Sequence, residues 1–111
     1  MIPLFKVHKP VGVEKLISEV WESGFITEGE YSDKFEKMFG EYVGNKNTSL
    51  VNSCTSAIAL TSRMCGIQPG DEIITTPMTC MATNEPFVND GAKLVWADID
   101  PSTGNIDPYR S

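Results

Sequence analysis

The sequence has few cysteine and histidine residues. Its three cysteines are Cys54, Cys65 and Cys80, and its one histidine is His8. An odd number of cysteines without regular spacing argues against the disulfide framework of a small secreted domain. Neither CxxC nor HxxH spacing occurs, which argues against a zinc site. We therefore expect a protein that works in a reducing compartment and holds no metal.

Positive charge and long apolar runs are scarce as well. The chain has nine basic and fifteen acidic residues, a net charge of −6 and no cluster of Lys or Arg. Such a surface disfavours duplex nucleic acid and anionic membranes. No apolar run reaches membrane-spanning length, and the first residues lack the apolar core of a secretory signal. These absences predict a cytoplasmic protein that binds neither nucleic acid nor membranes.

Two common nucleotide-binding motifs are missing too. The GxxxxGK[ST] pattern of P-loop proteins and the GxGxxG fingerprint of dinucleotide-binding folds do not occur. What is present is an ordinary globular composition, with 41% hydrophobic and 22% charged residues. A chain of 111 residues is long enough for one small domain.

Apolar periodicity divides the chain into a helical start and an alternating remainder. Helical spacing predicts helices over residues 13–23 and 31–43, separated by a loop between two glycines. Later residues alternate between strand-like and helix-like runs, which predicts an α/β fold with a parallel sheet. The expected strands cover residues 48–52, 72–76 and 93–97, and the expected helices between them cover 53–64 and 78–88.

Three parallel strands make an incomplete sheet, because both faces and both edges of a parallel sheet need cover. The last strand would expose an unpaired edge, and the helices would expose apolar faces. We therefore expect a truncated domain that associates with another copy of itself. A homo-oligomer follows from this.

Hydroxyl side chains gather where the 48–52 strand meets the next helix. Ser53, Thr55 and Ser56 open that helix, where free backbone N–H groups and the helix dipole favour an anion. Two interpretations stay open: a phosphate site, or ordinary N-capping by Ser and Thr.

The segment 76–83 follows the next strand and lies at the same carboxyl edge of the sheet, where α/β folds bind ligands. Cys80 in this segment is either a reactive thiol or a small residue that packs beside a ligand. Asp98 and Asp100 follow the third strand as either a carboxylate pair or a plain turn.

The order of motifs resembles the N-terminal part of the DegT/DnrJ/EryC1/StrS family of pyridoxal-phosphate (PLP) aminotransferases, which act on nucleotide sugars. No single motif is decisive, but their order and spacing agree along nearly the whole chain. The matching segments are residues 2–4 (family opening), 23–29 (SG-x-[IL]-T-x-G), 35–39 (the following helix), 52–57 (SGT-[AS]-A), 69–74 (PGDEVI), 77–83 (P-x-x-T-[FWY]-x-A-T), 91–100 (GAKPVFVDID) and 105–107 (NID).

The resemblance implies the type I aminotransferase fold and supplies roles by position. It implies a helical segment over 1–46 and, over 47–111, the first part of a three-layer large domain that binds PLP. By position, Cys54, Thr55 and Ser56 would hold the cofactor phosphate, and Cys80 would contact the pyridine ring. In relatives a glycine usually stands at position 54 and an aromatic residue at position 80. The loop with Thr27 and Gly29 would contact substrate near the dimer interface.

The resemblance also implies an activity that this chain lacks the residues to perform alone. In the family, one lysine bonds to the cofactor and moves protons, and one aspartate pairs with the pyridine nitrogen. Both match positions beyond Ser111, so no catalytic residue is predicted here. The expected parent enzyme transfers an amino group from an amino acid such as glutamate to a keto-sugar nucleotide, in sugar or polysaccharide biosynthesis.

Two other functions remain open at this stage. The chain is alternatively a stand-alone, non-catalytic module that keeps the phosphate cradle or the dimer surface. A small thiol-redox or flavodoxin-like domain that uses Cys54 or Cys80 is the third hypothesis, and the absence of CxxC weighs against it.

Overall fold

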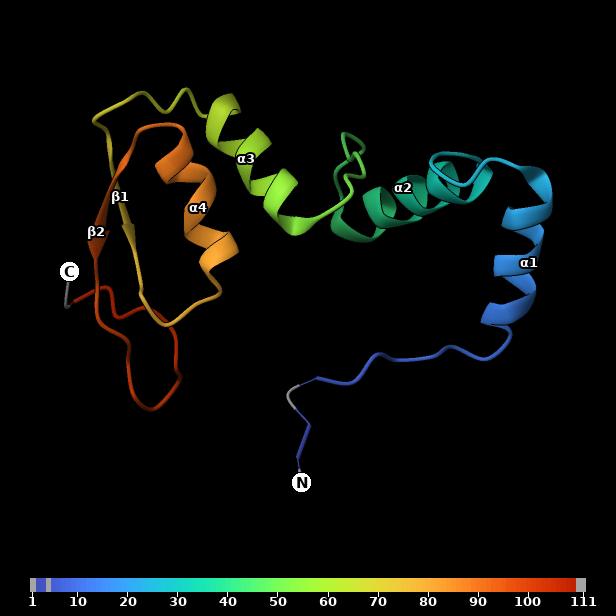
Figure 1. Cartoon of the computed structure of the whole chain (residues 1–111), viewed down its shortest axis with the longest axis horizontal. Coiled ribbons are helices and arrows are strands. Elements are labelled where there is room, and N and C mark those ends of the chain that lie inside the picture. The colour runs from blue at the N-terminus through green and yellow to red at the C-terminus, as the bar shows by residue number, and fades with distance from the viewer. Residues whose placement is uncertain (1, 4, 110–111) are drawn as a thin grey trace. The chain divides into compact units, whose positions relative to one another are not determined.

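The computed structural model describes residues 2–3 and 5–109, so Leu4 in the predicted family opening lies outside it. The chain forms two compact units, Met1–Leu50 and Val51–Ser111. The elements, drawn in Figure 1, are helices α1 (Val13–Ser23), α2 (Glu30–Val43), α3 (Cys54–Met64) and α4 (Met81–Asn89), and strands β1 (Glu72–Thr75) and β2 (Lys93–Trp96). No helix among the described residues is long and apolar enough to cross a bilayer.

The first unit consists of α1, α2 and the loops that follow them. The predicted helix over 13–23 has the observed bounds, and the one predicted over 31–43 begins one residue earlier. Gly24 ends α1 in the left-handed conformation (φ 74°), and its N–H returns to the carbonyl of Trp21. Phe35 and Phe39 stack on α2 with ring centroids 5.8 Å apart. The apolar stripes read from the sequence are therefore helical.

The strand predicted over residues 48–52 is wrong, because this segment folds back onto α2. The hydroxyl of Thr48 donates to the carbonyl of Glu36 (2.9 Å), and the Leu50 N–H donates to the Glu36 carboxylate (2.6 Å). Gly40 is buried under the segment, and a Cβ there would lie 2.8 Å from the Asn45 carbonyl oxygen. Residues 48–50 are thus bonded to a helix through one hydroxyl and one backbone N–H, and no strand of the described part of the chain pairs with them.

The second unit is built around a β1–α4–β2 motif. The two strands pair in parallel, with Glu72 opposite Lys93 and Thr75 opposite Trp96. Helix α4 packs on β2, and α3 packs on α4. The expected α/β fold with parallel pairing is confirmed, although the described residues form two strands rather than the three predicted.

Two turns lock the amino ends of the strands together. The Gly70 N–H donates to the Gly91 carbonyl (2.9 Å), and the Lys93 N–H donates to the Asp71 carbonyl (2.8 Å). Gly91 has φ 84°, and a Cβ on it would lie 3.0 Å from the Cβ of Pro69. A glycine is therefore needed here for two reasons, the left-handed backbone and the close approach of the proline ring.

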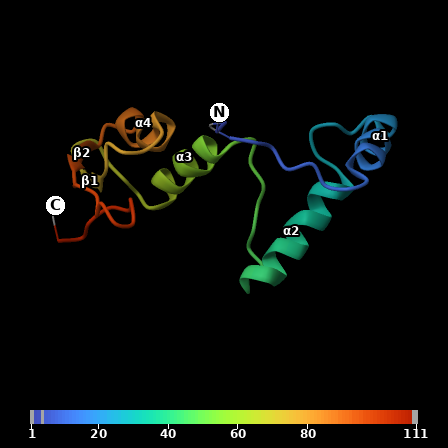
Figure 2. The same cartoon turned by 90° about the horizontal axis from the view of Figure 1, so that it is seen from below.

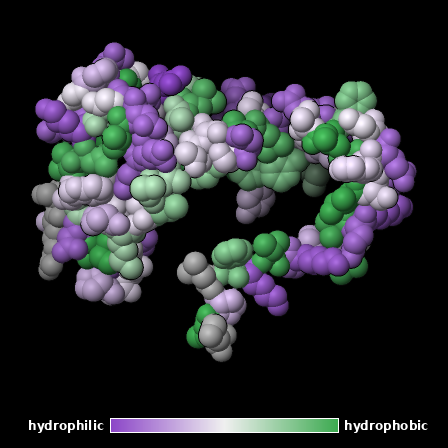
Figure 3. Space-filling model, in the orientation of Figure 1, coloured by the Kyte–Doolittle hydropathy of each residue, from purple (hydrophilic) through white to green (hydrophobic). Residues whose placement is uncertain are grey.

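The core of the described residues is small. Ala92 and Ala97 are its buried hydrophobic residues, whereas Trp21, Phe25 and Tyr42 are each more than 70% exposed. Figure 3 shows hydrophobic surface over α1 and α2 as well as over the second unit. Large apolar side chains therefore lie on surfaces that the described residues leave exposed.

Candidate functional site

The first turn of α3 is held by a local network of hydroxyl and amide groups. Ser53 is the N-cap, and its Oγ accepts the Ser56 N–H (3.1 Å). The Ser56 hydroxyl donates to Asn52 Oδ1 (2.7 Å) and lies 2.9 Å from Ser53 Oγ. The Ala57 N–H donates to the Ser53 carbonyl (3.1 Å). All these partners lie within six residues of sequence, so the cap forms from local contacts.

This cap leaves two backbone donors available. Within the described residues, neither the Cys54 N–H nor the Thr55 N–H has a hydrogen-bond acceptor. Asn52, Ser53 and Cys54 are exposed, and Thr55 is half-buried. Two free N–H groups at the positive end of an eleven-residue helix can bind one phosphate or carboxylate. The predicted residues Cys54, Thr55 and Ser56 therefore share one helical turn with the geometry of an anion site.

The turn that leads into α4 is held differently. The Thr75 hydroxyl donates to Asn84 Oδ1 (2.7 Å), and Asn84 Nδ2 donates to the Thr76 carbonyl (3.4 Å). The Met78 N–H donates to the Thr76 hydroxyl (3.2 Å). Asn84 is only 8% exposed, and it lies on the helix, whereas Thr75 ends the strand. This junction therefore depends on a contact between two elements.

Cys80 is the N-cap of α4 and has no side-chain capping bond. Its carbonyl accepts the Thr83 N–H (2.9 Å), so its backbone belongs to the helix start. The three cysteines are free and exposed. Among the described residues, no histidine or carboxylate is hydrogen-bonded to the Cys80 thiol. The geometry therefore favours a packing contact for Cys80 over the role of an activated nucleophile.

The starts of α3 and α4 lie on one side of the second unit. Figure 1 shows β1 and β2 ending toward the side from which α3 and α4 begin, and Figure 2 shows the two helices side by side as well. At the far end of the helices, the Ser62 hydroxyl donates to Asp90 (2.7 Å), and Arg63 lies 3.5 Å from the same carboxylate. The predicted residues at 54–56 and at 80 thus lie at the starts of two helices that begin on the same side of the second unit.

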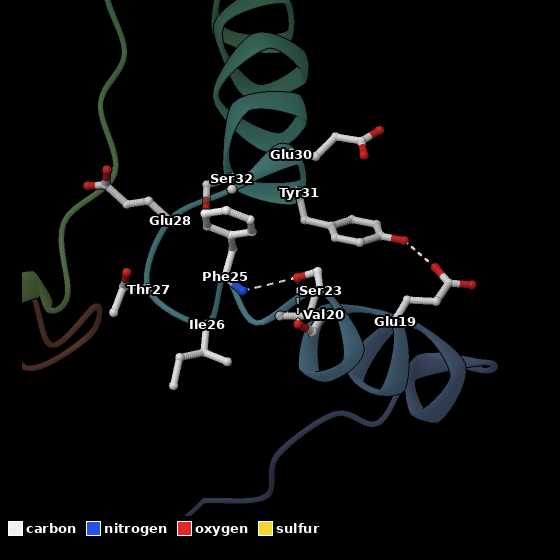
Figure 4. Close-up of a pocket in the computed structure, with 11 residues that line it drawn as sticks. Glu19, Val20, Ser23, Phe25, Ile26, Thr27, Glu28, Glu30, Tyr31 and Ser32 are labelled. Atoms are coloured by element: carbon white, nitrogen blue, oxygen red, sulfur yellow. Dashed lines mark hydrogen bonds between the residues drawn. The ribbon is translucent and has the colours of Figure 1, made fainter.

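The loop with Thr27 and Gly29 lies in the first unit, where it lines a cavity of about 460 Å³ (Figure 4). The Phe25 N–H donates to the Ser23 hydroxyl (3.2 Å), and the Tyr31 hydroxyl donates to the Glu19 carboxylate. That bond to Glu19 raises the pKa of Tyr31 above its ordinary value. Gly29 has an extended backbone (φ 169°) that other residues also adopt, so its conformation alone does not require glycine.

The two aspartates after β2 serve turns. Asp98 accepts the N–H of Ile99 (2.8 Å), and Asp100 accepts both the N–H (2.8 Å) and the hydroxyl (2.7 Å) of Ser102. The bonds from Ser102 hold the pKa of Asp100 below its ordinary value. Over residues 2–3 and 5–109, no group of three His, Cys, Asp or Glu side chains is placed to hold a metal ion.

Sequence reasoning missed two residues that build these helix starts. Asn52 accepts a hydrogen bond from the Ser56 hydroxyl, and Asn84 on α4 accepts one from Thr75 at the end of β1. The sequence did give a signal for Asn52, because Asn, Ser and Thr side chains close together in sequence tend to form local hydrogen bonds. Asn84 had only a weak one, a polar residue in the first half of a helix that follows a strand.

Comparisons with known proteins identify the family of the chain. The model of the DegT/DnrJ/EryC1/StrS aminotransferase family matches residues 12–110. The spore coat polysaccharide biosynthesis protein SpsC of Bacillus subtilis is 43% identical over 102 residues, which cover 90% of this chain and 26% of that protein. The 3-oxo-glucose-6-phosphate:glutamate aminotransferase of B. subtilis is 33% identical over 94 residues, or 85% of this chain and 21% of that enzyme.

A solved structure with a bound cofactor is also similar. E. coli GDP-4-keto-6-deoxy-D-mannose-3-dehydratase with bound hydrated PLP superposes with a TM-score of 0.83 at 30% identity, over 95% of this chain and 28% of that one. The chain thus spans about a quarter of the length of the relatives it matches. With a family match from residue 12 to residue 110, the chain belongs to the DegT/DnrJ/EryC1/StrS aminotransferase family.

Proposed function

We propose that this chain supplies the phosphate-binding start of the large domain in a PLP-dependent aminotransferase. The enzyme would move an amino group from an amino acid, such as glutamate, to a keto-sugar nucleotide. The observation that carries the proposal is the pair of free N–H groups at the start of α3, within a chain that matches the family along most of its length. Relatives whose names include a glutamate aminotransferase of an oxo-sugar phosphate support the substrate class.

The residues of α3 fit a phosphate ester. The N–H groups of Cys54 and Thr55 would donate to its oxygens, and the helix dipole would favour its negative charge. The Ser56 hydroxyl already donates to Asn52, so it would add a bond only by turning away from that amide. Bound PLP supplies an electron sink for negative charge on the substrate, which is chemistry that no side chain of this segment offers.

The other predicted contacts extend the proposal. Cys80, exposed at the start of α4, would touch the cofactor ring through its sulfur where relatives carry an aromatic residue. Thr27 and Gly29, in the loop that lines the cavity of the first unit, would contact substrate. We assign residues 1–46 to an N-terminal helical segment and 47–111 to the first part of the PLP-binding domain.

The exposed apolar surfaces support assembly. Trp21, Ile17 and Ile26 line an apolar groove on the first unit, and β2 ends the described sheet at one edge. Another copy of the protein, as a homodimer, would cover surfaces of this kind. Three free cysteines and a net charge of −6 favour a soluble enzyme in the reducing cytoplasm.

The proposal is tested by reading the coding frame past Ser111 and assaying the complete product. A frame that continues to a lysine and an aspartate in the family's context, with glutamate-dependent amination of a keto-sugar nucleotide, is the expected result. A frame that stops at Ser111 would sink the aminotransferase proposal for this polypeptide. In that case the stand-alone α/β module with a phosphate cradle or dimer surface would take its place.

A further inference from the structure

Asn84 is one of two buried polar residues in the described chain, and both of its amide atoms are used. Its Oδ1 accepts the Thr75 hydroxyl at 2.7 Å, and its Nδ2 donates to the Thr76 carbonyl at 3.4 Å. The side chain is 8% exposed, so water does not readily replace these partners. An unpaired amide at this depth is unfavourable, which makes the bonds to β1 important for the local structure.

The position of Asn84 connects these bonds to Cys80. Asn84 lies one helical turn after the Cys80 N-cap, whose carbonyl accepts the Thr83 N–H. Its partners Thr75 and Thr76 lie where β1 ends and the loop begins. The amide therefore joins the two ends of the loop that carries residues 77–80.

Other contacts in the loop are local. Met78 bonds to Thr76 (3.2 Å), and the Thr79 hydroxyl bonds to the Thr83 hydroxyl (3.3 Å). These bonds shape each end of the loop separately, because neither crosses from the helix to the strand. Only the Asn84 amide fixes the start of α4 to the end of β1 by side-chain hydrogen bonds among the described residues.

We propose that Asn84 is a positioning residue, which holds Cys80 in place against the end of the sheet. The identity of the group that Cys80 contacts, the cofactor ring, rests on the function proposed above. The placement itself rests on the two amide bonds alone. Loss of these bonds would free the start of α4 and leave the start of α3, with its local cap, unchanged.

The first test is residue-resolved hydrogen exchange on the full chain with Asn84→Ala. Two hydrogen bonds of ordinary strength are lost, so the opening constant at the Thr83 amide is expected to rise about tenfold or more. The Ala57 amide, bonded to Ser53 in the α3 cap, should keep its rate. Glu85→Ala, an exposed neighbour on the same helix, is the matched control and should change neither amide.

Two outcomes overturn the proposal. Equal acceleration at Thr83 and Ala57 would mean that Asn84 only supports overall stability, and no acceleration at Thr83 would mean that its bonds do not hold the loop. If Asn84→Ala fails to fold, the same exchange measurement on Thr75→Val tests the proposal instead. This substitution removes the hydroxyl at nearly constant shape and should accelerate Thr83 exchange about tenfold or more, again without effect at Ala57.

A second measurement links the placement to the cofactor. PLP is added to the chain without substitutions (the parent chain) and to Asn84→Ala, and the absorption spectrum of PLP is recorded for each. The expected result is a shifted absorption band and weaker binding in the variant, with Glu85→Ala unchanged. Identical spectra and affinities in parent and variant would overturn the role of Asn84 toward the ring. A parent chain that binds no PLP would count against the proposed function, whereas the exchange result would still decide the placement.

Discussion

The starts of α3 and α4 differ in where their hydrogen bonds come from. The α3 start is capped by Ser53 and Asn52, its immediate neighbours in sequence, and it leaves the N–H groups of its first two residues free. The α4 start has no side-chain cap, and it is held by Asn84 against the end of β1. A locally capped helix start can offer its backbone to an anion, whereas one held by a neighbouring element can present a side chain at a fixed place.

The largest effect is expected from removing one of the free N–H groups at the start of α3. Cys54→Pro removes one donor, and Ser53 is already extended (φ −161°, ψ 158°), as a residue before proline must be. A hydrogen bond to a charged group is lost, so PLP phosphate affinity should fall about tenfold or more.

The same change at the first residue of α4, Met81→Pro, is the matched control. Cys80 is likewise extended (φ −64°, ψ 135°), so the helix should tolerate the proline. Titration of PLP, followed by phosphorus NMR with circular dichroism to check helicity, measures both variants. Equal losses of affinity would show that the α3 start is not the phosphate site.

The next effect tests the contact between elements at α4. Thr75→Val keeps the side-chain shape but leaves Asn84 Oδ1 buried without its donor. The free energy of unfolding should fall by about 2 kcal/mol, measured by urea denaturation. Thr76→Val serves as the comparison, because its hydroxyl bonds only to the Met78 N–H in an exposed turn. A Thr75→Val variant as stable as the parent would contradict the importance of this bond.

A smaller effect is expected at the local cap. Ser53→Ala removes the acceptor of the Ser56 N–H and should reduce the free energy of unfolding by about 1 kcal/mol. Hydrogen exchange should become faster at Ser56 and stay unchanged at Thr83, which is bonded to Cys80. Ser53→Asp, another good N-cap, should restore the stability but repel the cofactor phosphate. Faster exchange at both helix starts would show that they are not independent.

The smallest effect concerns pH. The pKa of Asp100 lies below its ordinary value because Ser102 donates to its carboxylate. The charged form therefore stabilises this turn above the ordinary pKa, and the contribution is lost as the pH falls through the lower folded pKa. The Ser102 amide resonance should titrate with a midpoint below the ordinary pKa of an aspartate. Ser56 and Thr83 amides, bonded to uncharged oxygens, should not follow that transition, and Asp100→Asn should abolish it.

The helices could be predicted from sequence because their signals are local. Apolar spacing and the glycines at 24 and 44 set the bounds of α1 and α2, and β-branched residues marked β1. The strand expected over 48–52 does not form, because the Thr48 hydroxyl and the Leu50 N–H are hydrogen-bonded to Glu36 on α2. Strand propensity gives no information on whether a neighbouring strand is present to accept those bonds.

The candidate site also has one part that follows from local sequence and one part that depends on tertiary packing. The residues that cap α3 are consecutive in the sequence, so sequence alone determined a capped helix start at 53–56. Only the tertiary structure decided that Asn84 on α4 reaches Thr75 at the end of β1. The physical reason is that a cap is formed by residues a turn apart, whereas a buried amide needs partners that only packing brings close.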